Sequence, residues 1–165
     1  MNRIKVISDP AELVPILRCV DTEAKQKIFR DLSNEWLTSK QIEERYGPEG
    51  EEALQFFEKV KIVETKWQTS ATMSPEKAYH AFYSSFHINA TVPVQEISDI
   101  LFIAMMPEKD YRKFEDRLMK TIGDDGRFMG DVADELKVTP TMLKALVKRS
   151  ARFDFRGHRI LKFKE

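Results

Sequence analysis

The chain has 165 residues, of which 42 % are hydrophobic and 33 % charged, a composition typical of a folded globular protein rather than a disordered one. Its 27 basic and 27 acidic residues cancel, and its single cysteine, Cys19, excludes a disulfide within the chain and favours a cytoplasmic location. The most apolar stretch, residues 97–106, is shorter than the roughly 18 residues of a membrane span, so no membrane partner and no signal peptide are expected.

The first sixty residues predict four helices. Asp9 and Pro10 begin the first, because an aspartate at the N-cap accepts a backbone hydrogen bond and proline fits the first helical turn. Asp21 or Thr22 caps the second. Apolar residues at helical spacing place the third and fourth at residues 39–46 and about 49–60.

A change of period follows these helices. Residues 61–68 and 78–92 are rich in β-branched and aromatic side chains, and the loop between them consists of turn formers. This pattern predicts one long β-hairpin. Helices followed by a hairpin are the layout of a winged helix.

Two helices are predicted in the middle of the chain. Pro93 and Pro107 bracket the first, which is apolar over most of its circumference and is therefore expected to be buried. The second covers residues 108–122 and ends at Gly123. We expect the first of the two, or the helix at Pro10, to supply a homodimer contact.

The last forty residues predict a second, more compact unit. A helix over residues 128–136, which is expected to bury Phe128, is followed by a turn at Lys137-Val138. Thr139 caps the next helix, and Pro140 occupies its first position. A short hairpin with Gly157-His158 at its turn ends the chain. Two helices joined by a tight turn and followed by a hairpin are typical of a winged helix-turn-helix.

The helix after Pro140 is predicted to have an inner and an outer face. The inner stripe is apolar and consists of Met142, Leu143, Leu146 and Val147. The outer stripe consists of Thr141, Lys144, Ala145, Lys148 and Arg152. From residue 139 to the end, eight basic residues face two acidic ones, so the remainder of the chain carries the compensating negative charge. A basic outward helix beside a basic hairpin predicts binding to DNA phosphates.

Together these elements predict a mainly α protein with small β-hairpin wings (α+β), with a winged helix-turn-helix at both ends joined by central helices. The predicted domains are residues 1–92, 93–125 and 126–165. Double-stranded DNA is the predicted partner. The predicted DNA-binding residues are Thr139, Thr141, Lys144, Lys148, Arg149, Arg152, Arg156, His158 and Arg159.

Two segments carry a resemblance to known regulators. The sequence VADELKVTPTMLKALVKRS resembles the helix-turn-helix core of prokaryotic winged-helix transcription regulators, although Lys137 stands where such motifs usually have glycine. Residues 21–64 resemble the ArsR-type (arsenic-repressor-like) regulators, and most closely an archaeal subgroup with a second winged helix. The resemblance implies a DNA-binding dimer and, often, a metal or ligand sensor; the effector itself is not predicted.

One feature of the ArsR-like segment favours a different function. The helix at residues 49–60 places four glutamates and one lysine on its exposed positions, and glutamates repel phosphate. A winged-helix protein–protein interaction module of the transcription machinery is therefore the alternative.

No enzyme, metal site or cofactor is predicted. A thiolate metal sensor needs clustered cysteines, and the chain has only Cys19, which we expect to be buried. His80 and His87 are expected on opposite faces of one strand and so cannot chelate together. No phosphate-binding glycine loop or nucleophile motif is present.

Overall fold

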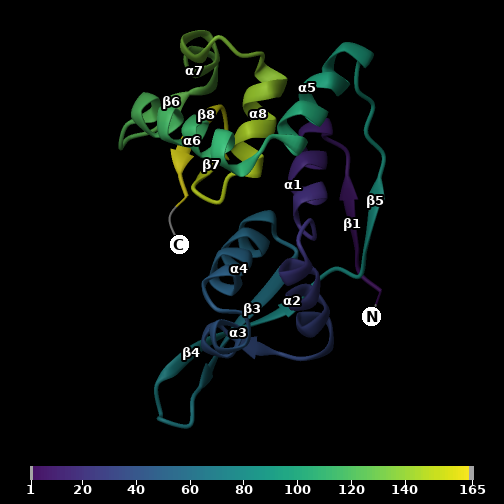
Figure 1. Cartoon of the computed structure of the whole chain (residues 1–165), viewed down its shortest axis with the longest axis vertical. Helices are drawn as coiled ribbons and strands as arrows, with labels where there is room; N and C mark the ends of the chain where they lie inside the picture. The colour runs from purple at the N-terminus through teal and green to yellow at the C-terminus, as the bar shows by residue number, and fades with distance from the viewer. Residues whose placement is uncertain (1, 164–165) are drawn as a thin grey trace. The chain divides into compact units, whose positions relative to one another are not determined.

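The computed structural model describes residues 2–163 and shows an α+β protein with small sheets (Figure 1). Its described residues divide into two compact units. The first comprises the residues up to 7 together with 19–89, and the second comprises 8–18 together with the residues from 90 onward. No helix within residues 2–163 has both the length and the apolar character needed to cross a membrane.

The first unit contains three helices and a three-stranded antiparallel sheet. Its elements in chain order are β1 (Ile4–Ile7), α2 (Glu23–Asn34), β2 (Leu37–Thr38), α3 (Ser39–Tyr46), α4 (Pro48–Val60), β3 (Val63–Thr69), β4 (Pro75–Ala81) and β5 (Ser85–Ile88). The strand order is β2-β4-β3. Thr22 caps α2 by accepting a hydrogen bond from the Lys25 amide, as one of the two predicted alternatives required.

The strand expected over residues 78–92 is in fact two separate strands. β4 ends at Ala81, and β5 (Ser85–Ile88) pairs in parallel with β1 (Ile4–Ile7). The prediction of one long strand was wrong because the composition of residues 78–92 gives no sign of a break. The parallel partner lies about eighty residues away in sequence, which no local pattern reveals.

The second unit repeats the order of elements found in the first. Its elements are η1 (Pro10–Glu12), α1 (Leu13–Arg18), α5 (Val94–Met105), α6 (Glu108–Ile122), β6 (Arg127–Phe128), α7 (Met129–Leu136), α8 (Pro140–Arg149), β7 (Phe153–Arg156) and β8 (Arg159–Lys162). Its strand order, β6-β8-β7, matches that of the first unit. In both units a helix, a short strand, two helices and a hairpin therefore follow one another.

Two apolar clusters hold the second unit together, and α8 contributes to both. In the first cluster Leu143 and Val147 of α8 pack with residues of α6, α7 and the β7–β8 hairpin. In the second, Ala145 and Leu146 pack with residues of η1, α1, α5 and α6. Burying a large aliphatic side chain contributes about 1.5–3 kcal/mol, so α8 is fixed firmly on two sides.

Helix α1 therefore packs in the second unit, although the sequence prediction placed it in an N-terminal domain. Asp9 caps this segment as predicted, but the first turn, Pro10–Glu12, is a 3-10 helix. Val14 is fully buried against the α5 and α8 side of the unit. The chain enters the second unit twice, once after β1 and once after β5, and α1 follows the first of these crossings. Proximity in sequence to the helices of the first unit therefore did not show that α1 packs in the second.

Helix α5 is buried on one side only, which corrects the prediction of a fully buried helix. Ile100, Ile103 and Ala104 face the cluster with α1 and α8. The opposite side is an apolar stripe that remains exposed and consists of Val94, Ile97, Leu101, Phe102 and Met105. Exposed apolar patches are typical of surfaces that bind another molecule, so this stripe is a candidate interaction surface.

Candidate nucleic-acid interface

The α7–α8 segment forms the tight helix-turn-helix that the sequence predicted. Lys137 ends α7 in the left-handed conformation, with φ 55° and ψ 47°, at the position where glycine is usual. The Thr139 hydroxyl accepts a hydrogen bond from the Met142 amide at 3.1 Å, so α8 begins with a capped turn and Pro140 at its first position. These local interactions set the direction in which α8 leaves the turn.

Only a narrow strip of α8 remains accessible between its two packed sides. Thr141, Lys144 and Lys148 are half-buried and form this strip. Ala145 was expected on the outer face, but it is fully buried in the cluster with α1 and α5. The prediction was wrong at this residue because helical periodicity cannot show that a second helix layer covers the side opposite the first core.

Three carboxylates border this strip. The hydroxyl of Thr141 donates to Glu96 Oε2 at 3.0 Å, and that of Thr139 donates to Asp99 Oδ2 at 3.3 Å. Both acids belong to α5. Near the C-terminal end of α8, Lys148 Nζ lies 3.4 Å from Glu12 Oε1 in η1. We call Glu12, Glu96 and Asp99 the acidic edge.

Arg149 was predicted to contact DNA, but it lies inside the unit. Its side chain is 2 % exposed, and it donates to the carbonyl oxygen of Ile103 at 2.6 Å and pairs with Glu108 at 3.2 Å. Its guanidinium lies 4.2 Å from the centre of the Tyr111 ring. Burial lowers the pKa of Arg149, and the nearby Arg18 lowers it further. This arginine holds α5, α6 and α8 together and cannot reach a duplex.

The remaining predicted residues lie at the surface. Arg152 is exposed, and its Nη1 atom lies 3.6 Å from Asp116 Oδ1. Arg156, His158 and Arg159 are exposed around the β7–β8 turn, where Gly157 takes a positive φ of 61°. We call Lys144, Lys148, Arg152, Arg156, His158 and Arg159 the basic surface.

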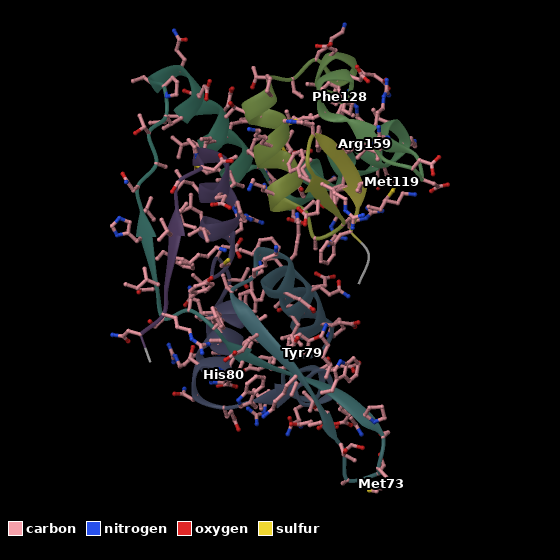
Figure 2. All side chains as sticks on the ribbon, turned by 180° about the vertical axis from the view of Figure 1, so that it is seen from behind. Met73, Tyr79, His80, Met119, Phe128 and Arg159 are labelled. Atoms are coloured by element: carbon pink, nitrogen blue, oxygen red, sulfur yellow. The ribbon has the colours of Figure 1, made fainter. Side chains whose placement is uncertain are left out.

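One exposed residue beside the hairpin, Phe128, was not among the predicted site residues. Phe128 was expected to be buried at the start of a helix, but it lies in β6, pairs with Arg159 of β8 and is 47 % exposed. Figure 2 shows Phe128 and Arg159 in the same part of the unit. The ring lies edge-on to His158, with centroids 6.5 Å apart. An exposed apolar ring beside Arg159 and His158 suits contact with the sugars or bases of a nucleic acid.

The corresponding helix of the first unit, α4, presents the opposite charge. Its exposed positions include Glu49, Glu51 and Glu52, and Glu58 forms an ion pair with Lys77 of the hairpin. The exposed face is therefore acidic, as predicted, but Lys59, which was predicted to be exposed on it, is buried. Such a face is electrostatically unsuited to phosphate.

The residues considered for metal or redox chemistry are dispersed. His80 lies on β4 and stacks on Trp36 with ring centroids 5.1 Å apart, whereas His87 lies on β5, so the two are not on one strand as expected. Cys19 is buried, and burial raises the pKa of its thiol to about 12. Among residues 2–163 there is no cluster of three or more histidine, cysteine or acidic side chains that could hold a metal ion.

Comparison with known proteins supplies the family. No curated protein matches this chain. The sequence profile of the family described as ArsR transcriptional regulator matches residues 7–164, which include nearly all of both units. The protein therefore belongs to the ArsR family of transcriptional regulators.

Proposed function

We propose that this regulator binds double-stranded DNA through the basic surface of its second unit. The observation that carries this proposal is the exposure of Arg156, His158 and Arg159 around the hairpin turn, together with the partial exposure of Lys144 on α8. Guanidinium and ammonium groups bind phosphate oxygens. At the start of α8, the Thr141 hydroxyl is a candidate donor to base edges or phosphates. The acidic face of α4 supports the assignment of DNA contact to the second unit.

The test uses the full chain and a pool of random duplexes at two salt concentrations. We expect retention of duplex DNA that weakens as salt rises, because basic residues that bind phosphate release counterions. Enrichment of a common sequence after repeated selection would indicate an operator. A chain that passes through duplex and heparin columns at low salt would contradict DNA binding and favour the alternative, a protein-interaction module, for which the acidic α4 face is the supporting feature.

The apolar stripe of α5 supports a homodimer. Val94, Ile97, Leu101 and Met105 follow one another at spacings of three and four residues, and no charged side chain interrupts them on that side. A two-fold contact buries the same stripe twice. With Phe102 the stripe has five residues, so a two-fold contact completes the burial of ten exposed side chains, which gains roughly 10 kcal/mol against an association cost of about 4–15 kcal/mol. The balance favours a weak dimer that adjacent half-sites on DNA would stabilise.

Leu101→Glu is expected to abolish this dimer, because a carboxylate in the centre of an apolar contact loses its hydration without gaining a partner. Analytical ultracentrifugation across a concentration series measures the molecular mass in solution. We expect the variant to remain a monomer at every concentration. Met73→Glu is the matched control: Met73 is 84 % exposed at the tip of the β3–β4 hairpin (Figure 2). If both variants associate like the unmodified chain, α5 is not the dimer contact.

A further inference from the structure

The acidic edge lies where a duplex would have to approach α8. Glu96 and Asp99 of α5 and Glu12 of η1 each engage one residue predicted to bind DNA: Thr141, Thr139 and Lys148 respectively. Carboxylate and phosphate oxygens are both anionic acceptors, so they compete for the same donors. A threonine hydroxyl has a single proton, and while it donates to a carboxylate it cannot donate to a phosphate.

This edge is held in place by the core. Ile100, Ile103 and Ala104, in the helical turns just after the two α5 acids, are buried, as is Ala11, which precedes Glu12. The backbones of α5 and η1 therefore cannot withdraw without exposing apolar surface. The carboxylates stay beside the strip even when individual side chains rotate, and their charge repels phosphate at short range.

We propose that the acidic edge is an autoinhibitory contact that lowers the affinity of the basic surface for DNA. This inference rests on the proposed function of that surface. The three carboxylates occupy positions that phosphate oxygens would take near the two ends of α8, at Thr139 and Thr141 and at Lys148. Neutralising the carboxylates of the edge therefore raises DNA affinity. The same helix, α5, carries the exposed apolar stripe on its other side.

The test compares two triple variants of the full chain with equal net charge. One carries Glu12→Gln, Glu96→Gln and Asp99→Asn, which keep the shape of the edge and remove its charge. The control carries Glu43→Gln, Asp131→Asn and Asp134→Asn, three exposed acids on α3 and α7. Duplex affinity is measured at two salt concentrations. We expect a gain of about 10-fold or more for the edge variant and less than about 3-fold for the control.

A further substitution separates a local contact from a general charge effect. Lys148→Ala is expected to change affinity little in the unmodified chain, where Glu12 engages the lysine, and to remove most of the gain in the edge variant. Equal gains in the two triple variants, or additive effects of Lys148→Ala, would overturn the inference while leaving the proposed function intact. Absence of duplex binding in every variant would instead reject the proposed function, and the inference with it.

Discussion

Reversing two charges of the basic surface, Lys144→Glu with Arg156→Glu, is expected to reduce duplex affinity by roughly 100-fold at about 0.1 M salt. A charge 4 Å from a phosphate interacts by about 1 kcal/mol at the dielectric constant of water. Two reversals remove two attractions and add two repulsions, and salt screens part of the sum. The slope of log affinity against log salt should also become shallower by about two, because two phosphate contacts are lost.

Lys113→Glu with Arg117→Glu provides the control for this variant. Both residues are exposed on α6, outside α8 and the β7–β8 hairpin, and the net charge changes by the same amount. We expect less than a 3-fold loss of affinity and an unchanged salt slope. A loss as large as that of the test variant would show that net charge, and not the position of Lys144 and Arg156, governs binding.

Removal of Arg149 is expected to affect stability and not DNA contact. Arg149→Met should lower the free energy of unfolding by about 2 kcal/mol, because the carbonyl oxygen of Ile103 loses a charge-assisted hydrogen bond in a buried position. Methionine keeps the volume of the aliphatic stem and limits the size of any cavity. Urea unfolding followed by circular dichroism measures the change.

The comparison with Lys144→Met makes the Arg149 result decisive. Lys144 is half-exposed on the strip, so its replacement should change stability by less than about 0.5 kcal/mol and weaken DNA binding. Arg149→Met should instead lower the free energy of unfolding. Its duplex affinity, measured on folded protein, should stay within about 2-fold of that of the unmodified chain. If Arg149→Met instead weakens DNA binding strongly at full stability, the buried role assigned to Arg149 is wrong.

Local chemistry made the secondary structure predictable. Thr139 and Pro140 mark the start of α8, and Gly157 marks the final turn; both were found where the sequence predicted them. Helix α6 was also predicted with its observed bounds, Glu108–Ile122. Capping, proline geometry and turn residues act over a few neighbours, so they can be read from sequence.

Features that depend on a second layer could not be predicted in this way. The burial of Ala145 follows from the packing of α1 and α5 against α8, and α1 comes from the other end of the chain. Arg149 is buried by its contacts with α5 and α6. The exposed position of Phe128 depends on the pairing of β6 with β8. A periodic pattern shows which side of a helix is apolar, but it cannot show how many neighbours that helix has.

The sequence by itself therefore determined the helix-turn-helix elements, the concentration of positive charge after residue 139 and the acidic face of α4. The tertiary structure alone decided which of those charges remain available. It buries Arg149, leaves the hairpin turn exposed and places Glu12, Glu96 and Asp99 beside the strip of α8. The physical reason is that charge is a property of the residue, whereas exposure and pairing depend on segments that are distant in sequence and adjacent in space.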